Sequence, residues 1–152
     1  MEGKIDFPLF GLEIDVMIGK GVRLEYAEKC AGYLQNLPKQ VIEKLCEGAI
    51  NYCEEFRVYF DDEGLSIPEN MQSREILKYI HPNSLIVDTP EDDSIIAFQM
   101  ELNCDWEVEH GMEWVIRDSE VLYVGPFNGE SAWYEKEHFK TGFGQSYVAI
   151  DD

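Results

Sequence analysis

The sequence is short of basic residues. It has 12 Lys and Arg against 31 Asp and Glu, so its formal net charge is -19. Contacts to phosphate need clustered Lys and Arg, and this composition therefore argues against the binding of nucleic acid or of an anionic membrane. A basic protein or a cation is a more compatible partner, although strong acidity also serves solubility alone.

Long apolar runs and a cysteine pattern are missing as well. No stretch approaches the roughly 18 consecutive apolar residues that span a bilayer, and the N-terminus MEGKIDFPLF has no basic region followed by an apolar run. We therefore expect a cytoplasmic protein. The cysteines have neither the spacing of a zinc site nor that of a disulfide framework, so we expect reduced and mostly buried thiols. They are Cys30, Cys46, Cys53 and Cys104.

Sequence motifs of enzymes are also absent. There is no GxSxG elbow, no P-loop, no HExxH pair and no GxGxxG after a predicted strand. The sequence therefore indicates no catalytic residue, no metal ligand and no cofactor. It favours a protein that is not an enzyme.

What the sequence does have is enough apolar material for one folded domain. Its 152 residues are 45% hydrophobic and 12% aromatic, well above the range in which chains stay disordered. No linker or internal repeat divides the chain. We expect a single domain over residues 1–152, with a core at residues 7–125. The C-terminal segment, residues 126–152, is rich in Gly and aromatic side chains.

The first half of the chain predicts a strand followed by helices. Apolar and polar residues alternate over residues 10–18, which is the period of a half-buried strand. The period then changes to three and four residues. This change predicts a short helix over residues 26–37 and a long, core-facing helix over residues 38–53. A third, shorter helix is expected over residues 73–81, stopped by Pro82.

The clearest pattern is a strict alternation of apolar and mostly acidic residues from Ile96 onward. A three-residue hairpin loop at residues 109–111 keeps the apolar residues of both strands on one face, with Trp106 opposite Trp114. Gly111 then takes the loop position that needs a positive φ. We expect this register for the hairpin.

A second tight turn at residues 118–119 adds a third antiparallel strand to this meander. Apolar side chains at Val115, Leu122 and Val124 predict that a helix or the C-terminal segment covers its second face. A last strand is expected at residues 147–150. The sequence thus predicts an α+β fold, an antiparallel sheet made of an N-terminal strand pair and a C-terminal meander, packed against two to three helices.

The acidity is concentrated in one interval. No Lys or Arg lies between Lys78 and Arg117, and carboxylates recur there on the polar side of the predicted strands. In the predicted register, five of them share one face of the sheet. Three interpretations remain open: a solvated surface, a docking surface for a basic protein, and a carboxylate site for a metal or for catalysis. The five are Glu101, Asp105, Glu107, Glu109 and Glu113.

Other residues of the same hairpin are predicted to be structural. Trp106 and Trp114 hold it from its apolar side, Gly111 forms the loop, and His110 is a turn residue rather than a metal ligand. Cys104 lies on the apolar face, and no sequence feature places a basic group near it to activate its thiolate. We expect a buried and unreactive thiol there.

The segment at residues 104–112 resembles, through its W-E-x-E-H-G stretch, a segment that recurs in uncharacterised bacterial domains. In those domains a short hairpin follows and ends near Val-Gly, which Val124 and Gly125 match. The resemblance implies an α+β unit over residues 7–125, with a strand pair and helices before the sheet. Some relatives of such domains appear in families similar to the immunity proteins of bacterial polymorphic toxin systems, so the resemblance implies a group of families rather than one function.

We therefore expect a non-enzymatic, acidic binding protein that uses the five carboxylates to engage a basic protein, as an immunity-like antagonist of a toxin would. The alternative is a divalent-metal-binding module or a metal-dependent hydrolase on the same acidic strand face. A third hypothesis is an assembly module whose aromatic C-terminal segment self-associates.

Overall fold

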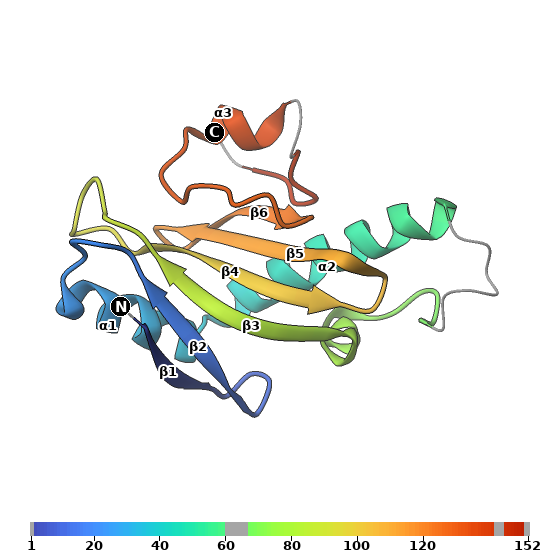
Figure 1. Ribbon diagram of the computed structural model, residues 1–152. Helices are drawn as coiled ribbons and strands as arrows, with labels where there is room; N and C mark the ends of the chain where they lie inside the picture. The colour runs from blue at the N-terminus through green and yellow to red at the C-terminus, as the bar shows by residue number, and fades with distance from the viewer. Residues whose placement is uncertain (1, 60–66, 142–144, 151–152) are drawn as a thin grey trace.

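The structure, a computed structural model, consists of one six-stranded sheet with its two long helices on one face (Figure 1). It describes residues 2–59, 67–141 and 145–150. The strands lie in sequence order across the sheet. They are β1 (Glu2–Phe7), β2 (Leu12–Ile18), β3 (Ile80–Val87), β4 (Ala97–Cys104), β5 (Glu107–Arg117) and β6 (Glu120–Gly125). The helices are α1 (Leu24–Gln35), α2 (Lys39–Tyr59), the 3-10 helix η1 (Ser73–Tyr79) and α3 (Lys136–Lys140).

Neighbouring strands of the sheet are antiparallel except β2 and β3, which run parallel. Parallel neighbours need a long crossover, and here the crossover contains α1, α2 and η1. The predicted strand pair and the predicted meander are therefore parts of one continuous sheet. The α+β fold expected from the sequence is confirmed.

The helices α1 and α2 lie behind the sheet in Figure 1 and cover what we call the first face. One row of side chains on this face crosses five strands, and each side chain in it is at most 5% exposed. Burial of such a row in a continuous core supplies much of the favourable free energy of folding. The row consists of Val16, Leu85, Met100, Trp114 and Val124.

The long amphipathic helix predicted over residues 38–53 is confirmed as α2, whose apolar stripe is buried. The third predicted helix is correct only in part. Residues 73–79 form the 3-10 helix η1, but Ile80 and Pro82 belong to strand β3. Pro cannot donate to a strand ladder, and the pairing of β3 with β4 is irregular directly after Pro82.

The C-terminal segment covers part of the opposite face of the sheet, which we call the second face (Figure 1). Ala132 and Phe139 of this segment pack with side chains of β4, β5 and β6 in a second apolar cluster. The cover predicted for this face is thus present, and the C-terminal segment provides it. Residues 147–150 are not a strand, although the Tyr147 N–H donates to the Val124 carbonyl at 2.9 Å.

The tight turn predicted at Asp118 and Ser119 is confirmed. Both residues have a positive φ, of 53° and 64°, as the favoured two-residue hairpin turn requires. Beyond this turn a bulge shifts the register of β5 and β6. As a result, Trp114 faces Val124, whereas an unshifted register from the turn would place it opposite Tyr123.

Helix α2 comes close to strand β6 at Gly48. A Cβ placed on Gly48 would lie 2.5 Å from Val148 Cγ1 and 2.8 Å from Val124 Cβ.

We predict that Gly48→Ala lowers the free energy of unfolding by about 1–3 kcal/mol, because overpacking outweighs the better helix propensity of Ala. Gly32→Ala in α1 is the control, since a Cβ there meets nothing within 4 Å. It should raise stability by up to about 1 kcal/mol. Equal free energies of unfolding of both variants in urea would contradict the close packing of α2 on β6.

Candidate functional site

The five carboxylates predicted to form one exposed row lie in different environments. Glu107 and Glu113 are buried, with exposed fractions of 9% and 0%. Glu101 is half-buried, whereas Asp105 and Glu109 are exposed. The prediction of a single exposed row is therefore wrong.

The error comes from the position of the hairpin turn. Strand β4 ends at Cys104 and β5 begins at Glu107, so the chain turns at the two residues between them. The hairpin loop predicted at residues 109–111 lies inside β5 instead. Trp106 consequently lies in the turn and not opposite Trp114.

Residues 108–111 form a bulge in β5. The strand pairing leaves all four of them opposite the single residue Asn103 of β4. Gly111 ends the bulge with a φ of 72°, and a Cβ on it would lie 2.5 Å from the Leu102 carbonyl oxygen. Gly111 thus has the positive φ that the sequence predicts, but in a bulge instead of a hairpin loop.

Glu107 is the paired residue of β5 directly before this bulge. Its carboxylate accepts hydrogen bonds from the backbone N–H of Glu109 at 2.9 Å and from that of His110 at 3.1 Å, and it lies 2.6 Å from Nδ1 of His110. The carboxylate satisfies backbone donors at the point where the bulge interrupts the strand ladder. Glu107 is therefore an internal acceptor, while the side chain of His110 stays 67% exposed.

Helix α2 contacts the bulge from the first face. The Tyr52 hydroxyl donates to the Gly111 carbonyl at 2.9 Å, and its ring meets the Trp106 ring edge to face at a centroid distance of 5.6 Å. Tyr52, Trp106 and Trp114 are all buried in the main core cluster. The two Trp side chains therefore lie on the apolar side of the hairpin, as the sequence predicts.

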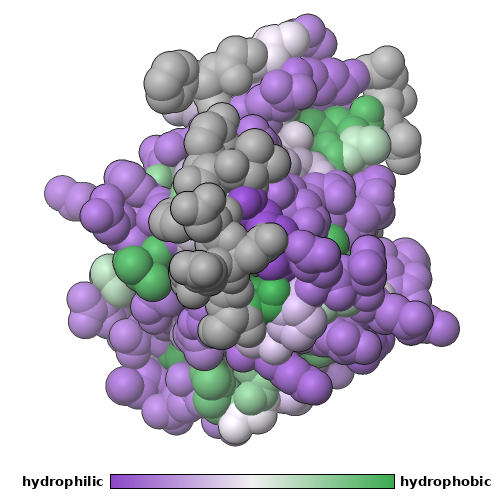
Figure 2. Space-filling model, turned by 90° about the vertical axis from the view of Figure 1, so that its right-hand side faces the viewer, coloured by the Kyte–Doolittle hydropathy of each residue, from purple (hydrophilic) through white to green (hydrophobic). Residues whose placement is uncertain are grey.

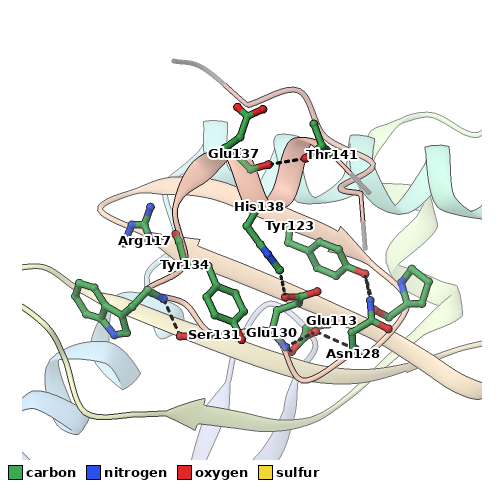
Figure 3. Close-up of polar contacts among 12 residues, drawn as sticks. Glu113, Arg117, Tyr123, Asn128, Glu130, Ser131, Tyr134, Glu137, His138 and Thr141 are labelled. Atoms are coloured by element: carbon green, nitrogen blue, oxygen red, sulfur yellow. Dashed lines mark hydrogen bonds and ion pairs between the residues drawn. The ribbon is translucent and has the colours of Figure 1, made fainter. Parts of the chain in front are cut away.

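Glu113 lies on the second face, beneath the segment that follows β6 (Figure 3). Its carboxylate accepts hydrogen bonds from the N–H of Asn128 at 3.1 Å and from the N–H of Glu130 at 3.0 Å. Gly129 between them has a φ of 70°, a conformation in which successive N–H groups can converge on one acceptor. Burial raises the pKa of Glu113 to about 7, although the two N–H donors oppose this shift.

Further polar contacts continue from this carboxylate through the C-terminal segment (Figure 3). His138 Nε2 lies 2.6 Å from a carboxylate oxygen of Glu130. The Asn128 amide donates to the Tyr123 hydroxyl at 3.1 Å. These contacts join α3 and the loop before it to β5 and β6. They were not predicted from the sequence, in which only the turn-forming Asn128-Gly129 pair gives a signal for the loop.

The other half of the second face carries no helix among the described residues, and we call it the open face (Figure 1). One row of residues crosses five strands from Lys4 through Asp15, Ser84 and Glu101 to Glu113. This row is exposed at its β1 end and buried at its β5 end; between them Ser84 is buried and Glu101 is half-buried. The side chains of Lys4 and Asp15 are 66% and 60% exposed, whereas Glu113 is fully buried under the C-terminal segment.

Acidic side chains dominate the open face. On strands β1 to β4, all within the described residues, Lys4 is the one Lys or Arg, and its Nζ lies 3.3 Å from Asp15. Asp105, in the turn after β4, lies 2.9 Å from His81 Nε2. Glu101 and Asp105 of the predicted row belong to this face. Its carboxylates are Glu2, Asp6, Glu13, Asp15, Glu101 and Asp105.

A cavity of about 650 Å³ lies beside the bulge. Its walls come from α2, from the bulge itself, from the segment after β6 and from the chain near Tyr147. Phe56, Phe127 and Tyr147 contribute aromatic rings, and Glu55 and Glu107 contribute carboxylates. Figure 2 views the molecule from the side on which α2 ends and the chain turns from β4 to β5. The surface visible there is mostly hydrophilic.

The cysteines are buried thiols, as the sequence predicts. Burial raises their pKa values to about 11 for Cys30, Cys46 and Cys53 and to about 12 for Cys104. The reactive thiolate form is therefore disfavoured. In the part of the chain that the structure describes, no group of three or more His, Cys, Asp or Glu side chains could hold a metal ion.

The fold and these sites define an α+β protein with helices on one face of its sheet and a C-terminal segment on part of the other. Residues 1–131 match a domain family described as a domain of unknown function (DUF6985), and the chain belongs to this family. The match covers all six strands and the loop that Glu113 binds. Comparison with curated proteins and with solved structures found no match. Among the described residues, no helix is long and apolar enough to cross a membrane.

Because Glu107 is an internal hydrogen-bond acceptor, we expect its loss to destabilise the fold more than the loss of the exposed Glu109. Glu107→Gln places an amide N–H donor among the N–H groups of the bulge, and we expect it to lower the free energy of unfolding by about 1–3 kcal/mol. Glu109→Gln carries the same charge change and should stay within about 0.5 kcal/mol of the wild type. Urea unfolding measures both. Equal stabilities would show that the carboxylate of Glu107 does not hold the bulge.

The buried carboxylate of Glu113 predicts a dependence of stability on pH. Its pKa rises from the ordinary value of 4.5 to about 7 in the fold, so between these values the unfolded chain binds fewer protons than the folded one. The free energy of unfolding should therefore fall as pH rises from about 4.5 to 7, by on the order of 1 kcal/mol per pH unit.

The contribution of Glu113 is isolated by comparison with Glu113→Gln, which cannot ionise. Urea unfolding of both proteins at several pH values between about 4.5 and 8 gives their difference in stability. We expect the wild type to lose stability relative to the variant as pH rises through this range. A difference that stays constant would mean that Glu113 does not change its pKa on folding.

Proposed function

We propose that the protein is a non-enzymatic binding protein that captures a basic protein on the open face, as an antagonist of a basic protein toxin would. The observation that carries the proposal is the composition of this face. Three strands and one turn place six carboxylates on it, against the single Lys4 among the described residues of β1 to β4.

The arrangement of these carboxylates favours a cationic partner. Asp6 lies directly opposite Glu13 on the neighbouring strand, and like charges in such a position repel each other. Lys or Arg side chains of a partner would relieve this repulsion. The net charge of -19 would also attract a basic protein over long range and raise the rate of encounter.

The open face also has the apolar centre that protein interfaces commonly contain. Met17 is 41% exposed and lies opposite the half-buried Ile86 on β3. Acidic residues of β1 and β2 flank Met17, with Glu2 opposite it and Asp15 two residues before it on β2. A partner could therefore bury Met17 and Ile86 while its basic side chains meet the surrounding carboxylates. The proposal that this partner is a toxin has a different basis. Residues 104–112 resemble a segment of bacterial domains, some relatives of which are similar to immunity proteins.

The test is a pair of charge-reversal variants with equal net charge. Glu13→Lys with Glu101→Lys changes the open face, and Glu28→Lys with Glu47→Lys changes the exposed sides of α1 and α2. A protein captured from the source organism and identified by mass spectrometry is titrated against both variants and the wild type. We expect a basic partner, a loss of affinity of about tenfold or more for the sheet variant through slower association, and little change for the helix variant.

Thermal melts of both variants control for unfolding and should agree within a few degrees. A partner that is not basic would contradict the proposal. So would a basic partner that binds the two variants equally, because binding would then follow net charge and not the open face.

A further inference from the structure

We propose that the cavity beside the bulge binds an organic cation, that is, a guanidinium or ammonium group on an apolar stem. The inference concerns a different surface from the open face and does not depend on the function proposed above. The cavity, of about 650 Å³, falls within the range of about 300–1,000 Å³ that is usual for small-molecule sites.

Aromatic rings line this cavity from two distant parts of the chain. Phe56 comes from α2, and Tyr147 comes from the C-terminal segment. Both rings contact Tyr52, which is fully buried: Phe56 edge to face at a centroid distance of 5.6 Å, and Tyr147 stacked at 5.1 Å. The core thus fixes two of the aromatic walls. The faces of such rings attract a cation that has lost part of its hydration shell.

The carboxylates in the cavity determine the sign of the ligand charge. The side chain of Glu107 is only 10% exposed, and its position is fixed by the backbone N–H groups of the bulge. Glu55 on α2 is exposed and adds a second carboxylate. Among the described residues, no Lys or Arg lines the cavity, and His110 lies against Glu107 at 2.6 Å.

These charges select among the possible ligands. An anion would be repelled by both carboxylates. A neutral apolar molecule would remove water from Glu107 without supplying a charge in return, which is unfavourable. A flat guanidinium group can contact an aromatic face and a carboxylate at once, and its stem can cover the apolar part of the walls.

The experiment compares two ligands of nearly equal shape, butylguanidinium and butylurea, by calorimetry and by ligand-observed NMR with the full chain. We expect a dissociation constant of about 1 mM or lower for butylguanidinium, in keeping with its few heavy atoms. Butylurea, which lacks the charge, should bind at least about tenfold more weakly. Equal binding of the two, or no binding of butylguanidinium at about 10 mM, would overturn the proposal.

Two variants on the same helix locate the binding. Glu55→Gln removes a carboxylate from the cavity, whereas Glu47→Gln removes an exposed one about two turns earlier on α2. We expect Glu55→Gln to weaken butylguanidinium binding by about three- to tenfold and Glu47→Gln to leave it unchanged. Equal effects of the two variants would place the cation elsewhere on the acidic surface and reject the cavity.

A third ligand, the blocked peptide acetyl-Gly-Arg-Gly-amide, distinguishes the two sources of such a cation. Binding of the peptide at least as tight as that of butylguanidinium would assign the cavity to an Arg side chain of a protein. Binding of butylguanidinium alone would assign it to a free small molecule. Both results support an organic-cation site, whereas failure of both ligands rejects it.

Discussion

The burial of the Glu113 carboxylate determines how the second face of the sheet is divided. Two N–H groups of the loop after β6 converge on this carboxylate, and the loop in turn leads to the apolar cover around Phe139. β5 from Met112 to Ile116 and β6 from Val121 to Gly125 are therefore buried on both faces, whereas β1 and β2 keep one face in solvent. The open face exists because the cover ends at Glu113, which is the fully buried end of the row that begins at the exposed Lys4.

The alternation of apolar residues predicted the sheet well up to Cys104 and failed directly after it. Phe98, Met100 and Leu102 lie on the core side as expected. The alternation continues through Val108, yet Val108 is 80% exposed because the chain has already turned. The turn contains no Gly or Pro, and one of the contacts that hold the bulge comes from Tyr52 on a distant helix. Local periodicity contains no information on such a contact.

The sequence predicted an acidic face on the sheet, but it did not predict which carboxylates form this face. The interval without Lys or Arg, between Lys78 and Arg117, predicted an acidic face on β4 and β5. Two of the predicted carboxylates, Glu101 and Asp105, do lie on the open face. The remaining carboxylates come from β1 and β2, and Asp15 reaches this face only through the parallel pairing of β2 with β3. That pairing joins residues about seventy positions apart. Glu107 was assigned to the surface because it falls on the polar side of the alternation. Buried carboxylates are rare unless they are bonded, and the bulge itself makes the bonds of Glu107.

The open face and the cavity differ in how much of each lies within the family match. The match ends at residue 131, so all the strands of the open face lie within it. The cavity is different, because Tyr147 and its neighbours, which form one wall, lie beyond the matched range. Any member of the family with the same six strands can form a sheet face of this shape. The cavity needs a C-terminal segment that returns to β6, as the bond from Tyr147 to Val124 makes it do here. One wall of the cavity therefore depends on residues outside the matched domain.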